Sequence, residues 1–175
     1  MKETMALEKE LFDRPTLKVA RELLGQTLCR SFQGEILRLP ITEVEAYDGF
    51  DDRASHAHRG RTARNAVMFG PAGYWYVYLC YGMHWMLNIV TGPIDYPAAI
   101  LIRGGGQYSG PGRLTKALKI DQTFDRLAAT KESALWLEQG AIDVDPEAIV
   151  CASRIGVTYA GEFWSKKQYR FLWKH

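Results

Sequence analysis

One stretch near the start of the sequence carries apolar residues at the spacing of a helix. It lies between Pro15, which suits a first helical turn, and Gly25, which suits a helix end. The pattern predicts a helix over residues 15–24. The same spacing predicts further helices over residues 114–120 and 124–137.

Strand patterns occupy much of the remaining chain. Short apolar runs bounded by turn residues predict strands over residues 27–32, 36–47, 73–81, 84–90, 98–103 and 152–158. We expect Pro40 to interrupt the second of these, because proline lacks the N–H that a strand pairing needs. The Gly82-Met83 pair predicts a tight turn and therefore a β-hairpin. Residues 48–66 are interpreted as a long loop, which in a compact domain is usually functional.

The order of these elements predicts an α+β fold, because helices and strands do not alternate as they do in βαβ repeats. We expect residues 1–175 to form a single domain. Its centre would be a curved antiparallel or mixed β-sheet, flanked by helices and carrying a protruding hairpin. A chain of 175 residues is long enough to bury a core without a disulfide or metal.

The sequence has no sign of an export or membrane segment. Its first residues alternate in charge and have no apolar centre, so we expect neither a signal peptide nor a transmembrane segment. Cys29, Cys80 and Cys151 form no CxxC pair and are interpreted as reduced thiols. These features favour a cytoplasmic protein without membrane contact.

Positive charge is concentrated in the middle of the chain. From Arg53 to Lys119 there are eight basic residues and one acid, Asp95, which gives +7 against −5 for the rest. The eight are Arg53, Arg59, Arg61, Arg64, Arg103, Arg113, Lys116 and Lys119. Such a segment favours a polyanionic partner such as nucleic acid. The alternative is a solvated face in which the fold mixes these residues with acids.

Two candidate sites lie just before and inside the long loop. In a strand, Glu43, Glu45 and Tyr47 would share one face, because successive side chains point to opposite sides. The plain alternative is that the glutamates face water on an edge strand. His56 and His58 have the HxH spacing of a metal site, but no second Cys or His cluster accompanies them. We therefore expect no bound metal.

Aromatic and basic residues suggest contacts with nucleic acid. Tyr76 and Tyr78 would share a strand face, and Tyr81 stands at the hairpin turn. They could simply pack in the core, or they could stack on bases and wedge into a duplex. Arg113 and Lys116 follow a Gly-Pro turn at a predicted helix start, where a phosphate would be favourable. An ordinary basic helix start is the alternative there.

A series of motifs, in order over about residues 11–164, resembles the alkyladenine (3-methyladenine or methylpurine) DNA glycosylases. These are monofunctional base-excision repair enzymes. The matching strings are Thr42–Gly49, Ser55-His56, Arg64-Asn65 with Met68-Phe69, Tyr76–Tyr78, Tyr81–Met83, Asn88-Ile89, Leu101–Arg103, Ser109–Pro111 and Arg154–Glu162. No single string is specific, but together they cover nearly the whole chain.

The resemblance implies a role for each matching residue. Glu45 would be the general base that activates water, and Arg103 would help to hold that water, with a backbone carbonyl near Val157. The pocket for a flipped base would be formed by Tyr47, His56, Tyr78 and Tyr76, with Asn88 as a gate beneath the base. Tyr81 would intercalate into the duplex. We expect the DNA phosphates to contact Arg61, Arg64, Arg113 and Lys116.

The resemblance implies a monofunctional DNA glycosylase that acts on alkylated or deaminated purines. These would include 3-methyladenine, 7-methylguanine, hypoxanthine and ethenoadenine, flipped out of double-stranded DNA. No lysine stands in the Glu45 motif to form a Schiff base, so we expect hydrolysis without strand cleavage. The resemblance implies no cofactor, and it implies a monomer, associated with the nucleoid if the source is bacterial.

Two other functions fit parts of the same pattern. A non-catalytic DNA- or RNA-binding module would have the same basic centre and aromatic strand, although it would not need a glutamate there. A metal-dependent nuclease could use Glu43, Glu45, Asp48 and His56.

Overall fold

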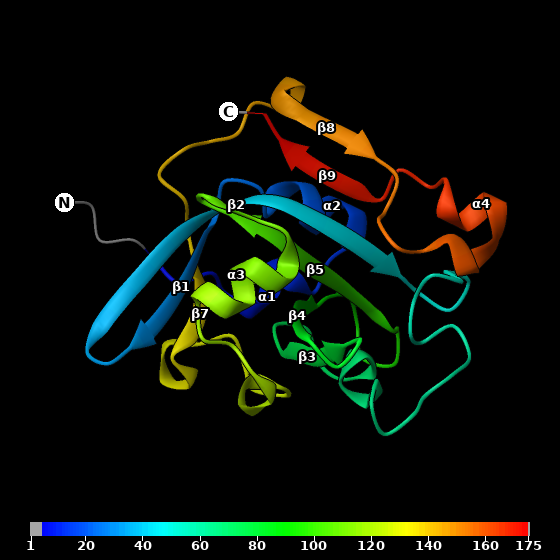
Figure 1. Ribbon diagram of the computed structural model, residues 1–175, viewed down its shortest axis with the longest axis horizontal. Coiled ribbons are helices and arrows are strands. Elements are labelled where there is room, and N and C mark those ends of the chain that lie inside the picture. The colour runs from blue at the N-terminus through cyan, green and yellow to red at the C-terminus, as the bar shows by residue number, and fades with distance from the viewer. Residues whose placement is uncertain (1–4, 175) are drawn as a thin grey trace.

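An antiparallel sheet organises the computed structural model, which describes residues 5–174 (Figure 1). The strands that the described residues form are β1 (Thr27–Phe32), β2 (Glu35–Asp48), β3 (Trp75–Cys80), β4 (His84–Val90), β5 (Ala98–Gly105), β6 (Tyr108–Ser109), β7 (Leu135–Glu138), β8 (Ile149–Ala152) and β9 (Arg170–Trp173). The main path runs β3-β4-β5-β2-β1-β7. Off this path, β6 pairs with β5, and β9 pairs with both β2 and β8.

Short helices and turns connect the strands, which confirms the α+β fold. The helices are α1 (Lys9–Phe12), α2 (Thr16–Glu22), α3 (Pro111–Ala117) and α4 (Gly161–Ser165). The 3₁₀ turns are η1 (Ala66–Phe69), η2 (Gln122–Phe124), η3 (Lys131–Ser133), η4 (Pro146–Ala148) and η5 (Thr158–Ala160). Helix α2 packs on β2 and β5, and α3 packs on β4 and β5. Within residues 5–174, no helix has the length and apolar character to cross a membrane.

Strand β2 links the two halves of the sheet. Its first part pairs with β1 as far as Pro40, and its second part, from Ile41, pairs with β5. The expected interruption at Pro40 is wrong: the strand is continuous, and the proline lies where pairing passes from one partner to the other. A missing N–H is tolerated at such a point. Register shifts between Ile41 and Val44 mark an irregularity of the bulge type, which re-aims the side chains that follow.

The predicted hairpin is confirmed as β3 and β4. Cys80 pairs with His84, and between them Tyr81 and Gly82 have φ of 50° and 67°. Two successive residues with positive φ are typical of the type I′ turn that suits the strand twist. The side chains at the tip point into solvent, since Tyr81 is 86% exposed and Met83 is 70% exposed.

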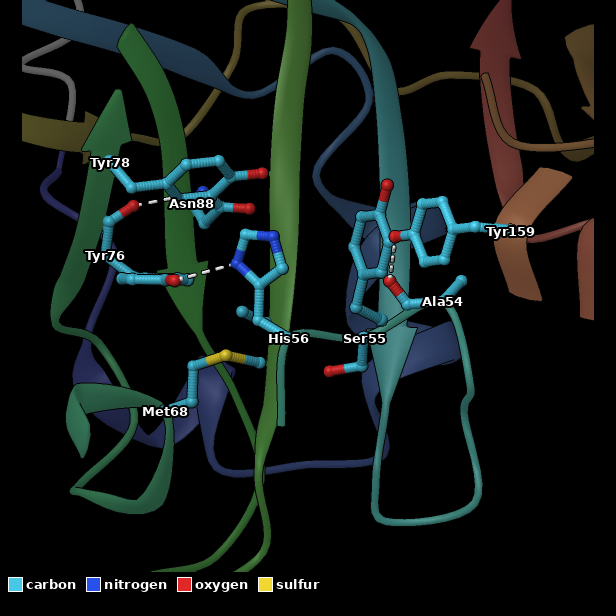
Figure 2. A pocket seen from close by; sticks show the side chains of 10 residues that line it. Ala54, Ser55, His56, Met68, Tyr76, Tyr78, Asn88 and Tyr159 are labelled. Atoms are coloured by element: carbon cyan, nitrogen blue, oxygen red, sulfur yellow. Dashed lines mark hydrogen bonds between the residues drawn. The ribbon is translucent and has the colours of Figure 1, made fainter. Parts of the chain in front are cut away.

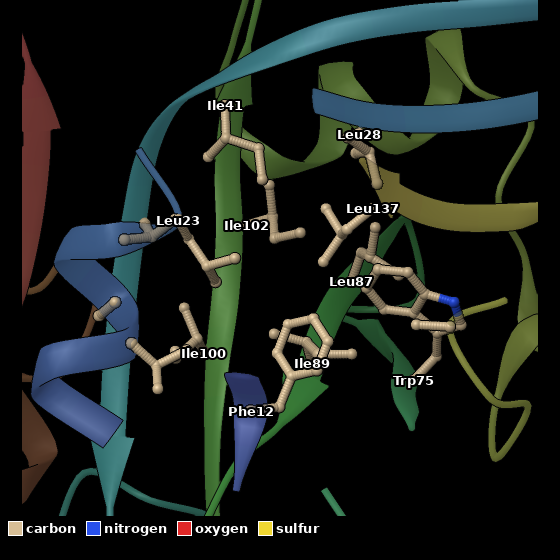
Figure 3. Packing of buried hydrophobic residues seen from close by; sticks show 14 of the residues in the cluster. Phe12, Leu23, Leu28, Ile41, Trp75, Leu87, Ile89, Ile100, Ile102 and Leu137 are labelled. Carbon is tan, nitrogen blue, oxygen red and sulfur yellow. The ribbon is translucent and has the colours of Figure 1, made fainter. Parts of the chain in front are cut away.

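Aliphatic and aromatic side chains of the sheet, α1 and α2 form the main core (Figure 3). Trp75 on β3 is fully buried, and its ring N–H donates to the carbonyl of Leu135 at 2.9 Å. A buried indole therefore has its one polar group satisfied. Ile100 and Ile102 on β5 are also fully buried, against Leu23, which follows α2, and neighbouring strands.

The segment 124–137 is not the predicted helix. It begins in η2, passes beside β3, where Leu127 accepts the backbone N–H of Trp75 at 2.8 Å, and ends as strand β7. All four residues of β7 are buried beside β1. A short apolar run fits a buried strand as well as a helix, and here pairing with β1 decides between them.

The prediction for residues 152–158 is also wrong over most of its length. Strand β8 ends at Ala152, and the chain then turns, with Gly156 at a φ of 75°. The turn brings Arg154 and Ile155 against the second half of β2, where each makes polar contacts. Helix α3 also departs from its prediction, because it begins at Pro111 and ends at Ala117. Strand β9 and helix α4 have no counterpart among the predicted elements.

We predict that Ile102→Ala lowers the free energy of unfolding by about 2–5 kcal/mol, because it leaves a cavity in the core. Ile94→Ala is the matched control, since the same change is made where the side chain is 65% exposed. Urea unfolding followed by tryptophan fluorescence measures both. Equal unfolding midpoints for the two variants would contradict the placement of Ile102 in the core.

Candidate active site

Glu45 lies in the second half of β2, between β5 and β9, and has no exposed surface. One oxygen, Oε1, accepts the backbone N–H of Ile155 at 2.7 Å and lies 3.4 Å from Nη1 of Arg103. The other oxygen, Oε2, accepts the hydroxyl of Tyr47 at 2.8 Å. The alternative that this glutamate faces water on an edge strand is therefore wrong.

Burial and the polar contacts of Glu45 act in opposite directions on its pKa. Burial raises the pKa of Glu45 above its usual 4.5. The charge of Arg103, the N–H of Ile155 and the hydroxyl of Tyr47 each act in the opposite direction on that pKa. The carboxylate is thus removed from water and supplied instead with fixed donors.

Glu43 and Arg170 hold Arg103 in place. Nε of Arg103 donates to Oε1 of Glu43 at 3.0 Å, and Nη1 of Arg170, on β9, donates to the same oxygen at 3.1 Å. Side-chain exposure in this group is low, at 10% for Arg103 and 12% for Glu43. Glu43 and Glu45 therefore contact the same arginine, and Glu43 acts on Glu45 through it.

A second ion pair, between Arg154 and Asp52, is fully buried. Nη2 of Arg154 donates to Oδ1 of Asp52 at 2.8 Å, and a second guanidinium nitrogen contacts the other carboxylate oxygen. Asp52 also accepts the backbone N–H groups of Asp48 and Ala54, each at 3.1 Å. The guanidinium lies 4.8 Å from the ring centroid of Tyr47. The pair therefore fixes the start of the long loop and supports the tyrosine that contacts Glu45.

Tyr47 also borders a pocket of about 320 Å³ (Figure 2). The pocket is lined by Tyr47, Ala54, Ser55, His56, Met68, Tyr76, Tyr78, Asn88, Ala99 and Tyr159. Strands β2 to β5, the long loop and η5 all contribute, so segments far apart in the sequence form its walls.

Aromatic rings make up one side of the pocket. Nδ1 of His56 lies 2.9 Å from the hydroxyl of Tyr76, and the ring centroids of His56 and Tyr78 are 4.6 Å apart. Figure 2 shows Tyr76 and Tyr78 on one side of His56 and Tyr159 on the other. Burial lowers the pKa of His56 below 6.5, and the charge of Arg64 adds to that effect. Burial also raises the pKa of Tyr76 to about 12, so these rings are neutral at pH 7.

Asn88 on β4 is 3% exposed and lines the pocket from the sheet side. Its Nδ2 donates to the carbonyl of Tyr76 at 3.0 Å, and the carbonyl of Met86 lies 3.5 Å from the same nitrogen. These contacts fix the orientation of the amide, because a rotated amide would turn its oxygen toward a carbonyl.

The predicted phosphate contacts lie in two places. Arg61 and Arg64 belong to the long loop; the Arg64 guanidinium is 5.0 Å from the ring centroid of Tyr78, and Arg61 lies 4.0 Å from the carboxylate of Asp95. Arg113 and Lys116 are exposed on α3, which packs on β4. The structure therefore brings the loop arginines close to the pocket and places the α3 residues beside the other strand of the hairpin.

Several members of the site are missing from the sequence prediction, and Tyr159 and Asp52 are two of them. Tyr159 lines the pocket, and its hydroxyl donates to the carbonyl of Ala54 at 2.7 Å. It falls within the matching string Arg154–Glu162, and that string is the sequence signal that could have identified it. Asp52 gives no such signal, because its partner Arg154 is 102 residues away in the sequence. The carbonyl of Val157 accepts the N–H of Ala160 at 3.0 Å, and the contact of a carbonyl near Val157 with the attacking water stays a prediction.

The acidic residues of this region do not form a metal site. Throughout residues 5–174, no group of three His, Cys, Asp or Glu side chains is arranged to hold an ion. Glu43 and Glu45 contact arginines, and His56 contacts Tyr76. This arrangement does not support the metal-dependent nuclease.

The known proteins that are similar to this chain belong to the family that its sequence motifs resemble. Residues 10–108 and 106–175 match the model of the methylpurine-DNA glycosylase family. A candidate 3-methyladenine DNA glycosylase of Methanocella arvoryzae is 43% identical, over 89% of this chain and 86% of its own length. One from a Wolbachia of Brugia malayi is 45% identical, over 92% and 96%. One from Psychrobacter cryohalolentis is 39% identical, over 93% and 89%.

We predict that Asp52→Asn lowers the free energy of unfolding by about 3–5 kcal/mol, because it leaves the buried charge of Arg154 without its partner. Asp51→Asn is the matched control, since it makes the same change at an exposed neighbour and should leave that free energy unchanged. Both are measured by urea unfolding. If the two variants unfold at the same urea concentration, the Asp52–Arg154 pair does not hold this loop.

Proposed function

The chain belongs to the methylpurine-DNA glycosylase family, and we propose that it excises alkylated and deaminated purines from duplex DNA with a water that Glu45 activates. At the level of the family, the chain is a DNA glycosylase of the 3-methyladenine type, an enzyme of base-excision repair. The choice of purines and the roles of individual residues are parts of the proposal.

The observation that carries the proposal is a fully buried carboxylate joined by one tyrosine to a pocket with aromatic walls. In the proposed reaction, the bond between C1′ of the sugar and the purine nitrogen breaks, and the base leaves with its electron pair. Water forms a new bond to C1′ and gives its proton to Glu45. The carboxylate also stabilises the positive charge that develops on the sugar. Water is the only co-reactant, so the reaction needs no metal or organic cofactor.

The neutral aromatic walls suit a stacked purine. Rings such as Tyr47 and Tyr78 attract a cationic base, which 3-methyladenine and 7-methylguanine are, by roughly 0.5–2 kcal/mol. Each ring already has a guanidinium near it, from Arg154 and Arg64. These charges weaken the preference for a cation. The pocket therefore supports neutral lesions such as hypoxanthine and ethenoadenine as well as cationic ones.

Asn88 supports the exclusion of normal guanine. Its amide is fixed by the carbonyl of Tyr76 and cannot turn to suit a different base. The exocyclic amine of guanine would meet this wall and would lose its hydrogen bonds to water, and buried unpaired polar groups are costly. Hypoxanthine lacks that amine and avoids the penalty.

The exposed hairpin tip supports base flipping. A base inside a duplex is out of reach, and rotating it out costs a few kcal/mol of stacking. Tyr81, at 86% exposure, has no other packing role and could fill the space that the base leaves. Arg61, Arg64, Arg113 and Lys116 would supply affinity for the phosphates that is independent of sequence.

The non-catalytic binding module is less well supported. A binding module has no need for a carboxylate at the centre of a basic surface, where it repels phosphate. Here that carboxylate is buried and is held by two side chains and a backbone N–H.

The function is tested with end-labelled duplexes that carry one hypoxanthine or ethenoadenine, and with N-methylpurine-rich DNA. Wild type is incubated with EDTA, and the duplexes are then treated with hot alkali. We expect cleavage at the lesion that depends on the alkali, as for a glycosylase without lyase activity. Cleavage without alkali, or activity that EDTA abolishes, would contradict the proposal, as would the absence of release from every substrate.

We predict that Glu45→Gln slows excision by about 10²- to 10⁴-fold, because a glutamine cannot accept the proton. Duplex binding should change little. Glu35→Gln, the same change at an exposed position of β2, is the control and should keep the wild-type rate. Single-turnover assays measure both. Excision at the wild-type rate by the Glu45 variant would exclude it as the base.

We predict that the single-turnover rate of wild type declines on the acidic side with a midpoint above 4.5, because burial raises the pKa of Glu45. The active form is the carboxylate, so activity is present above this pKa and is lost as pH falls through it. Arg103→Gln removes the largest opposing influence and should move the midpoint to higher pH. A midpoint that stays in place or moves to lower pH would contradict the assignment.

A further inference from the structure

A second hollow adjoins the rim of the base pocket. It encloses about 1030 Å³ of space open to solvent and is lined by Arg53, Ser55, His56, His58, Arg59, Tyr159, Ala160 and Gly161. Three of these residues, Ser55, His56 and Tyr159, also line the base pocket. We call this hollow the loop groove, because the long loop supplies most of its wall. The two hollows are therefore continuous across one shared rim.

The loop groove is basic, and its charges are free. Arg53 and Arg59 are exposed, and neither guanidinium makes a hydrogen bond or ion pair with any described residue. None of the lining residues is acidic. Among the acids near the groove, Asp52 contacts Arg154 and Glu162 contacts Lys166, and Asp51 does not line the groove. A groove with unpaired guanidinium groups and no acid in its wall is complementary to an anion.

The position of the loop groove selects the anion. When a flipped base occupies the pocket, its own sugar and phosphates stay at the rim, and the neighbouring phosphates of the same strand must run along the protein surface from there. The hairpin tip with Tyr81 does not border the loop groove. The loop groove therefore offers the backbone a path away from the point where Tyr81 would enter the duplex.

We propose that Arg53 and Arg59 bind backbone phosphates of the lesion-containing strand next to the flipped nucleotide. This proposal rests on the proposed function, because it needs a nucleotide in the base pocket. It adds a contact surface to the four basic residues expected from the sequence. It also assigns a role to the anchoring of the long loop, because the Asp52–Arg154 pair holds the segment from which both arginines project.

The first test measures how the affinity for a lesion duplex depends on salt. The lesion nucleotide carries a 2′-fluorine, which slows hydrolysis, so that Kd is measured on intact DNA. Arg53→Gln/Arg59→Gln should bind more weakly, with a slope of log Kd against log salt that is shallower by about 1.8, which corresponds to two lost phosphate contacts. Equivalently, the ratio of its Kd to the Kd of wild type should fall roughly tenfold between about 50 and 200 mM salt.

The matched control removes the same number of charges elsewhere. Lys18 and Lys131 are exposed on α2 and η3, outside the lining of both hollows. Lys18→Gln/Lys131→Gln should keep the wild-type slope. If both double variants lose affinity equally, the effect is one of net charge alone, and the proposal is wrong. A wild-type slope in the Arg53/Arg59 variant would overturn it as well.

The second test locates the contacts. Single phosphates of either strand are replaced by neutral methylphosphonates, one position at a time. We expect one or two positions beside the lesion at which the replacement weakens wild-type binding and has no further effect on the Arg53→Gln/Arg59→Gln variant. The proposal is overturned if the affinity losses from the methylphosphonate and from the double substitution add at every position. It is also overturned if the two changes depend on one another only at positions of the opposite strand.

The outcome is separable from that of the proposed function. Failure of wild type to release any base would count against the glycosylase reaction, while the salt slope would still report on the arginines. Conversely, wild type could excise the base while the Arg53/Arg59 variant binds DNA as wild type does. That result would overturn the phosphate contacts in the loop groove and would leave the proposed reaction unaffected. The proposal would also be overturned if the Arg53 and Arg59 substitutions weaken binding to an acidic protein and leave the affinity for DNA unchanged.

Discussion

The structure of this site depends on keeping a carboxylate charged after it has lost its water. Glu45 is fully buried, and a bare carboxylate in such a place would be neutralised by a proton. Three donors from separate parts of the chain replace the water: Arg103 on β5, Tyr47 two residues along β2, and the backbone N–H of Ile155 after β8. The fold must bring these three segments together for the glutamate to act as the base that we propose.

Two groups of buried or nearly buried arginine–carboxylate contacts bring those segments together. Glu43 is shared by Arg103 and Arg170 and so joins β2, β5 and β9. Asp52 and Arg154 join the long loop to the turn that carries Ile155. Buried ion pairs add little net stability compared with apolar residues, but breaking one is costly. Their effect here is to define one arrangement of the loop and the turn.

Much of the fold and some of the site follow from local patterns in the sequence. Alternation along β2 places Glu45 and Tyr47 on one face, and the tyrosines of β3 indicate an aromatic wall. The pairing of Asp52 with Arg154 does not follow, because it spans 102 residues and depends on the path of the chain. Strand β7 does not follow from the sequence either, because its apolar spacing also fits a helix. Only its pairing with β1 distinguishes the two.

The most direct test of this account is the ionisation state of Glu45 itself. The side-chain carboxyl carbon of glutamate is labelled with ¹³C, the Glu45 signal is identified by its absence in Glu45→Gln, and its chemical shift is followed with pH. The account predicts a carboxylate at pH 7 whose titration midpoint lies above 4.5. A Glu45 that stays protonated through pH 7 would contradict it, because an acid in that form cannot accept a proton from water.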